Sequence, residues 1–155
     1  MIDPRGPRFA ATITTIVLAA VLITASPWLL AVQAAVFGLA TFFGLRTSPY
    51  GLTYAHLVRP RLGPPPERED ERPPRFAQGV GFVFALTGFV ALAAGWTAVF
   101  YVAVAAALAA AFLNAAFGFC LGCEIYLLIH RFTSRETLPA SPYRAPSQPP
   151  EVTTP

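Results

Sequence analysis

Two cysteines spaced as C-x-x-C are the residues of this sequence whose types and spacing suit chemistry. Cys120 and Cys123 are the only cysteines among its 155 residues. On a helix, residues i and i+3 share a face, so the two sulfurs would lie close enough to form a disulfide or to bridge a metal. A bond between them would close a loop too small to stabilise the fold appreciably. The pair therefore indicates reactivity, either thiol–disulfide exchange or transfer of sulfane sulfur.

Two charged residues are candidates to modulate this pair. Glu124 is the first charged residue after a long uncharged run, and on a helix it would continue the same stripe. A helix that begins near residues 118–121 would direct the positive end of its dipole at Cys120 and favour the reactive thiolate. Arg46, from the first half of the chain, would stabilise a thiolate or an anionic sulfur species from across the molecule. Because the cytoplasm keeps thiols reduced, we expect a resting dithiol. We expect no bound cofactor.

Two other interpretations of the pair stay open. C-x-x-C is half of a zinc site, which His130 or His56 would have to complete, or else two more sulfurs supplied by a homodimer. Cysteines also pack as small, inert hydrophobic residues. A C-x-x-C motif is a stronger redox signal beside a thioredoxin-like βαβ pattern, and this sequence has no such pattern.

Two long uncharged runs must position the cysteines. The chain is 55% hydrophobic and 12% charged, whereas soluble domains carry about 25% charged residues. Residues 9–45 and 76–123 contain no charged side chain. Near its middle each run contains a segment with a helix-breaking Pro or Gly and a Trp, at residues 24–28 and 93–96. Since about 20 apolar residues cross a bilayer as a helix, we predict an all-α membrane protein with four transmembrane helices. The predicted spans lie near residues 9–25, 27–45, 76–94 and 97–119.

The basic residues predict the orientation of these spans. All 11 are Arg, and they lie before the first span, between the second and third, or after the fourth. Because positively charged loops stay in the cytoplasm, we expect a multi-pass protein of a bacterial plasma membrane with both termini cytoplasmic. A cleaved signal peptide over residues 9–25 is the alternative for the first span. The Arg residues flank apolar runs instead of forming a basic patch, which argues against nucleic acid as a partner.

The two halves of the chain resemble each other, at about residues 5–59 and 72–132. This pattern predicts two duplicated helical hairpins, a parallel repeat about an axis along the membrane normal. In this comparison Arg46 and Pro49 stand where the second half has its cysteines. The matching segments are Pro7–Ala10 with Pro74–Ala77, Trp28 with Trp96, and Phe43–Leu45 with Phe117–Phe119.

Less apolar stretches follow spans two and four, and we expect them to form short interfacial helices. A bend at Gly118 or Gly122 would lay residues 120–131 along the membrane surface. Residues 60–74 are expected to form a polar loop. The transmembrane domain would thus cover residues 1–132, followed by a disordered, proline-rich cytoplasmic tail over residues 133–155. The apolar stripe of the second interfacial helix would be Leu121, Ile125, Leu128 and Phe132.

Several segments together resemble an actinobacterial integral membrane family, domain of unknown function 4395, over roughly residues 2–132. The resemblance implies a four-span membrane protein without an assigned reaction. It also implies a thioredoxin-like or sulfurtransferase partner, because genes for such proteins often lie near those of the family. The segments that carry the resemblance are residues 3–10, 48–50, 59–63, 74–77 and 114–124.

The leading hypothesis is a dithiol partner in the lipid bilayer, acting in redox exchange or sulfur relay at the cytoplasmic face. Cys120 would be the attacking thiol and Cys123 the resolving one, in an accessory subunit of a thiol–disulfide or sulfur-transfer system. Two alternatives stay open, a small transporter or carrier subunit for a sulfur compound and a structural membrane assembly protein.

Overall fold

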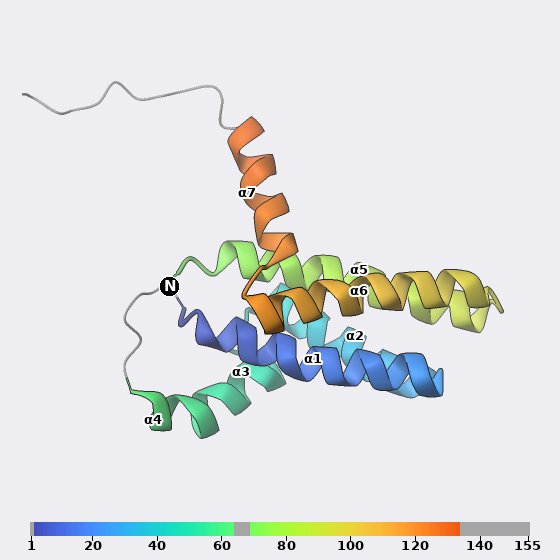
Figure 1. The fold of residues 1–155 in the computed structure, drawn as a ribbon, viewed down its shortest axis with the longest axis horizontal. Helices are drawn as coiled ribbons and strands as arrows, with labels where there is room; N and C mark the ends of the chain where they lie inside the picture. Colours follow the sequence, from blue (N-terminus) through green and yellow to red (C-terminus); the bar gives the residue numbers. More distant parts are fainter. Residues whose placement is uncertain (1, 64–68, 134–155) are drawn as a thin grey trace, which may run out of the picture.

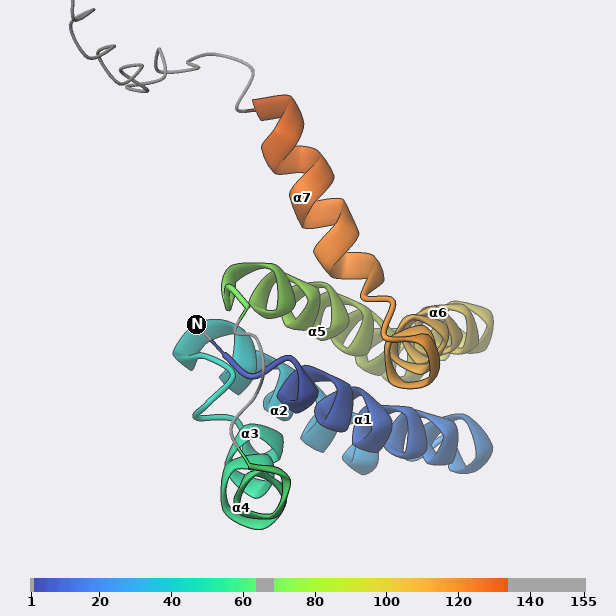
Figure 2. The same ribbon diagram turned by 60° about the vertical axis from the view of Figure 1, so that its left-hand side comes forward.

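The computed structural model describes residues 2–63 and 69–133, and within these ranges it is helical without a β-strand. Four long helices form a bundle, in which α1 packs on α6, α2 on α5, and α5 on α6 (Figures 1 and 2). The predicted all-α fold is confirmed. The long helices are α1 (Arg5–Thr24), α2 (Pro27–Phe43), α5 (Arg72–Ala93) and α6 (Thr97–Phe117).

Shorter helical segments follow each pair of long helices. After α2 the chain continues through three of them, of which the middle one is a π-helix. After α6 a single helix leaves the bundle at a steep angle (Figures 1 and 2). These segments are α3 (Pro49–Thr53), η1 (Tyr54–Val58), α4 (Arg59–Leu62) and α7 (Leu121–Thr133).

Local sequence explains where the long helices break. At the first break Ala25 is left-handed, the Ser26 hydroxyl accepts a hydrogen bond from the Leu29 N–H, and Pro27 opens α2, as proline favours the first helical turn. At the second break Gly95 has a φ of +78°, a conformation that suits glycine. Both breaks fall inside the predicted segments.

Three helices, α1, α5 and α6, are long and apolar enough to cross a membrane. The fourth, α2, is also apolar but has 17 residues. At 1.5 Å per residue it reaches about 25 Å, slightly short of the hydrocarbon thickness of about 30 Å. The structure therefore supports a multi-pass membrane protein by length and composition.

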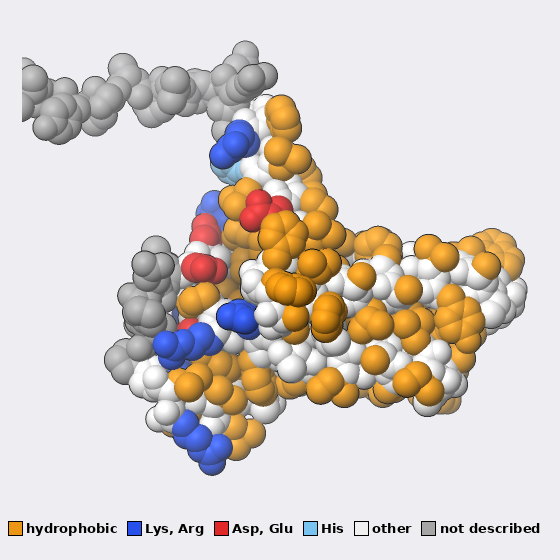
Figure 3. Space-filling view, viewed as in Figure 1, with side chains coloured by type: hydrophobic (Ala, Val, Ile, Leu, Met, Phe, Trp, Pro, Cys, Tyr) orange, Lys and Arg blue, Asp and Glu red, His pale blue; other side chains and the backbone are white. Residues whose placement is uncertain are grey.

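The inside and the outside of the bundle are both apolar. Leu18, Leu30, Phe100 and Val104 are fully buried where the four helices meet. On the outside, Ile23 is 85% exposed and many other large apolar side chains face outward, so that hydrophobic side chains are spread along the visible surface of the long helices (Figure 3). An apolar surface of this extent suits lipid better than water.

The charged side chains gather at one end of the bundle (Figure 3). At that end α1 and α5 begin, and α2 and α6 finish. Arg75 joins two of these helices, because its guanidinium donates to the carbonyl oxygens of Thr41 and Phe42 in the last turn of α2. The tips near residues 25 and 95 carry no charged residue.

The linker between the two pairs of helices differs from the predicted polar loop. Residues 59–62 are helical, and α5 begins at Arg72 and not near residue 76. The second difference arises because Pro73 and Pro74 fit the first turn of a helix, where their missing N–H groups cost nothing. Residues 64–68 and the predicted tail from residue 134 onward lie outside the described residues.

Candidate functional site

The predicted bend before the cysteines occurs at Gly118. This residue has a φ of +69° and closes α6, with its N–H donating to the Asn114 carbonyl at 3.0 Å. The chain turns within three residues, and α7 begins at Leu121. Cys120 therefore stands immediately before α7, and its carbonyl accepts the Glu124 N–H at 3.1 Å. This is the N-cap position of the helix, where the free N–H groups of the first turn point outward.

A disulfide joins Cys120 and Cys123, with 5.2 Å between their Cα atoms. The Cys123 N–H also lies 3.3 Å from the Cys120 Sγ and donates a hydrogen bond to it. Both residues are partly buried. A dithiol at rest was expected from the sequence; the structure contains the oxidised pair, and the resting state in the cell stays a prediction.

Gly122, one of the two residues between the cysteines, fixes their position on the bundle. A Cβ at Gly122 would lie 2.6 Å from the Ala77 Cβ and 2.7 Å from the Ala77 Cα, so α7 and α5 touch here with no room for a side chain. One turn later, the Tyr126 ring packs on the Phe76 ring with 5.6 Å between centroids. From the sequence, Gly122 was expected only as a possible bend; its packing role fits the enrichment of small residues where membrane helices touch.

The two charged residues selected as modulators, Glu124 and Arg46, lie in different surroundings. Glu124 is in the first turn of α7 and is exposed. Arg46 lines a cavity between α1, α2 and α3, which neither cysteine lines. Arg8, which the sequence analysis did not select, instead packs against Gly118, with its Cζ 3.7 Å from the place of a Cβ on that residue. The contact of α1 with α6 brings this cation to the turn that precedes the motif.

The histidines considered as metal ligands are also separated. His130 lies on α7 with its ring 6.1 Å from the Tyr126 ring, whereas His56 is exposed on η1. Among the residues that the structure describes, no group of three or more His, Cys, Asp or Glu could hold a metal ion.

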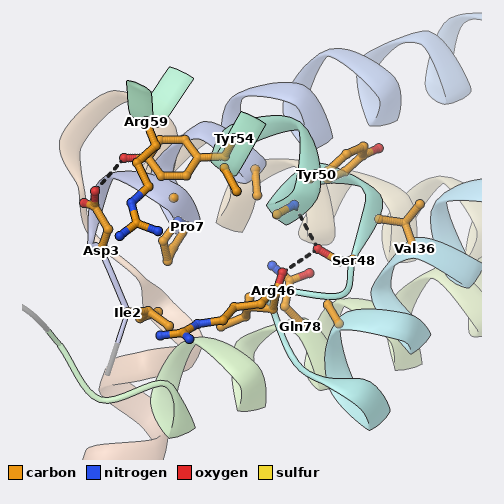
Figure 4. A pocket seen from close by; sticks show the side chains of 16 residues that line it. Ile2, Asp3, Pro7, Val36, Arg46, Ser48, Tyr50, Tyr54, Arg59 and Gln78 are labelled. Atoms are coloured by element: carbon orange, nitrogen blue, oxygen red, sulfur yellow. Dashed lines mark hydrogen bonds between the residues drawn. The ribbon is translucent and has the colours of Figure 1, made fainter. Parts of the chain in front are cut away.

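The cavity at the charged end has a volume of about 300 Å³ (Figure 4). On one side of it the Tyr54 hydroxyl donates to an Asp3 carboxylate oxygen at 2.8 Å, and the Tyr54 ring packs on Phe9. Burial, then the hydrogen bond and the negative charge of Asp3, raise the pKa of Tyr54 to about 12. Tyr54 therefore stays a neutral donor at physiological pH and ties η1 to the start of α1.

A buried amide joins the elements beside this cavity. Gln33 is fully buried in α2, where its Nε2 donates to the Thr14 hydroxyl at 3.5 Å and its Oε1 accepts the Tyr50 hydroxyl at 2.7 Å. Burial raises the pKa of Tyr50, which lies on α3 outside the long helices. The network satisfies a polar group inside an apolar bundle and holds α3 against α1 and α2.

Comparison with known proteins gives a family without an assigned activity. The family model described as Domain of unknown function (DUF4395) matches residues 2–131. No curated protein and no solved structure matches the chain.

Proposed function

The chain belongs to the DUF4395 family, and we propose that it is a membrane-bound thiol–disulfide exchange protein that works with a thioredoxin-like partner. The observation that carries this proposal is the sulfur pair at the start of α7, where the Cys123 N–H donates to the Cys120 Sγ. Helix N-termini and N–H donors favour a thiolate over a thiol, and the thiolate is the nucleophile in exchange. The partner would reach the pair from the charged end of the bundle.

The exchange moves two electrons. In the reduced protein, the Cys120 thiolate attacks one sulfur of the partner's disulfide; that bond breaks, and the departing partner thiolate takes a proton. Cys123, as its thiolate, then attacks the Cys120 Sγ, and the mixed disulfide breaks to release the partner's second thiolate. The Cys120–Cys123 disulfide forms, and the partner is left as a dithiol. The reverse sequence reduces the pair.

We further propose that α2 is the fourth span and that the charged end faces the cytoplasm. Although α2 is short, it runs beside α5, and Trp28 at its start is 82% exposed, as suits an aromatic residue at a membrane–water boundary. The clustering of Arg at the end opposite the two tips supports this orientation. The steep angle between α7 and the bundle would then lay α7 along the membrane surface (Figure 1).

Three pairs of matched contacts support the proposed duplication. Arg75 binds the last carbonyls of α2, and its counterpart Arg8 packs on the residue that ends α6. Phe9 packs on Tyr54 as Phe76 packs on Tyr126, with centroids 5.8 and 5.6 Å apart. The third pair consists of the N-terminal caps of α3 and α7.

The helix caps favour a different register for the proposed repeat. The Ser48 hydroxyl accepts the Gly51 N–H at 3.1 Å at the start of α3, as the Cys120 Sγ accepts the Cys123 N–H at the start of α7. We therefore match the cysteines to Ser48 and Gly51 in the proposed repeat, in place of the sequence-based match to Arg46 and Pro49. In the first half, the turn between the long helix and its cap is two residues longer, which shifts the match.

A trapping experiment tests the proposed function. In cells that express the full chain with Cys123→Ser, Cys120 lacks its resolving thiol, so the mixed disulfide with the partner should accumulate. We expect a reductant-sensitive adduct that mass spectrometry identifies as Cys120 joined to a thioredoxin-like protein. Cys120→Ser is the matched control and should give no adduct. If Cys120 captures no protein and stays open to alkylation after oxidant treatment, the proposal is wrong.

Cysteine labelling tests the orientation. In a chain with Cys120→Ser and Cys123→Ser, we expect Thr24→Cys and Ala94→Cys, at the two tips, to react with a membrane-impermeant maleimide on intact cells. Arg61→Cys, exposed on α4 at the charged end, should react only after lysis. Labelling of Arg61→Cys on intact cells, with the tips protected, would show that the chain is oriented opposite to the proposal.

A further inference from the structure

The cavity at the charged end reaches from charged residues into the apolar part of the bundle. Asp3 and Arg59 lie at one side of it, and Val36 lies at the other (Figure 4). Val36 precedes Phe43, the last residue of α2, by two helical turns, or about 10 Å. The cavity therefore extends from the charged end of the bundle about two helical turns inward, into its apolar part.

The packing of the helices leaves this space open. In the second half of the chain α5 and α6 contact each other extensively, whereas α1 and α2 contact each other much less. Between α1 and α2 the cavity wall is built from small or apolar side chains. These are Pro7, Ala10, Val36, Ala40 and Leu45.

The polar part of the lining carries a net positive charge. Arg46 and Arg59 contribute two positive charges, against the single negative charge of Asp3. That carboxylate already accepts hydrogen bonds from the Tyr54 hydroxyl and the Arg5 backbone N–H. The side chain of Gln78, from α5, adds an amide donor. Guanidinium groups bind carboxylates and phosphates strongly because they offer several N–H donors in one plane.

We propose that this cavity binds an amphiphile with an anionic head group, such as an anionic phospholipid of the surrounding membrane. The head group pairs with Arg46 and Arg59, and the first part of the apolar chain lies between α1 and α2, beside Val36. The volume of about 300 Å³ is at the small end of ligand pockets, so the rest of the chain extends into the bilayer. This inference does not depend on the proposed thiol exchange.

Lipid binding to the purified full chain in detergent tests the inference. Native mass spectrometry would compare phosphatidylglycerol, phosphatidylcholine and inorganic phosphate as separate probes. We expect phosphatidylglycerol to bind about tenfold more tightly than phosphatidylcholine, the equivalent of one charge-assisted hydrogen bond. Inorganic phosphate alone should bind more weakly than phosphatidylglycerol, because it has no apolar chain to bury.

Two neighbouring arginines give a matched pair of variants. Arg59 lines the cavity, whereas Arg61, two residues later on α4, does not; both are exposed, and each Arg→Gln change removes one charge. Arg59→Gln and Arg46→Gln should each abolish most of the preference for phosphatidylglycerol, while Arg61→Gln should retain it. If Arg59→Gln and Arg61→Gln lose the preference for phosphatidylglycerol equally, general surface charge causes that preference, and the proposed site is overturned. Equal affinity for inorganic phosphate and phosphatidylglycerol would show a site for free anions and overturn the amphiphile.

Discussion

Reduced protein that retains only Cys120 is expected to react with iodoacetamide about tenfold faster at neutral pH than protein that retains only Cys123. The two sulfurs differ in position by one helical turn. Cys120 stands at the N-cap of α7, where its Sγ accepts the Cys123 N–H, whereas Cys123 lies inside the first turn. The helix N-terminus therefore favours the thiolate of Cys120 more strongly. The backbone donor at position 123 remains when that residue is serine.

Alkylation rates of Cys123→Ser and Cys120→Ser across a pH series measure this difference. The curve for Cys120 should rise at lower pH than the curve for Cys123, since the rate follows the thiolate fraction. Equal curves would remove Cys120 from the role of attacking thiol. In the Cys123→Ser background, Arg8→Gln and Arg46→Gln also separate the two candidate cations. We expect Arg8→Gln to slow the reaction more, because Arg8 packs on Gly118 and Arg46 lines the cavity.

The features that could be predicted from the sequence are those decided by local conformation and by hydrophobicity. Ser26 and Pro27 carry the information for the first break, Gly95 for the second, and Gly118 for the bend before the cysteines. Each of these breaks depends on the backbone angles of one or two residues. Packing against neighbouring helices does not determine those angles. The position of the sulfur pair at the start of α7 follows from these local signals alone.

The surroundings of the sulfurs depend on packing between helices, and the sequence did not reveal them. Arg46 was the cation expected near the sulfurs, whereas the contact of α1 with α6 brings Arg8 to Gly118, a neighbour that was not predicted. The cavity likewise arises from the loose contact of α1 with α2, which no periodicity in either helix predicts. The proposed repeat rests on segments before and within the spans, and we propose a shifted register after them because the turns that follow α2 and α6 differ in length.

Replacing Gly122 by alanine is expected to release α7 from the bundle. The added methyl group would lie 2.6 Å from the Ala77 Cβ and 2.7 Å from its Cα, and a backbone atom cannot rotate away as a flexible side chain can. Overpacking of this kind costs about 1–3 kcal/mol. Alanine is the better helix former by about 1 kcal/mol, which offsets only part of this cost. We therefore expect the contact between α7 and α5 to weaken while α7 itself stays helical.

Hydrogen–deuterium exchange of the purified chain in detergent measures this effect, because opening of α7 exposes the contact residues of α5. Amides near Ala77 should exchange roughly tenfold faster or more in Gly122→Ala than in the parent protein. Gly6→Ala is the matched control, a glycine-to-alanine change in α1 whose Cβ would lie 3.4 Å from the Tyr54 ring, an ordinary contact. It should leave exchange near Ala77 unchanged. Unaltered exchange in Gly122→Ala would mean that α7 does not depend on this contact, and that the orientation of the sulfur pair on the bundle is set by the Gly118 turn alone.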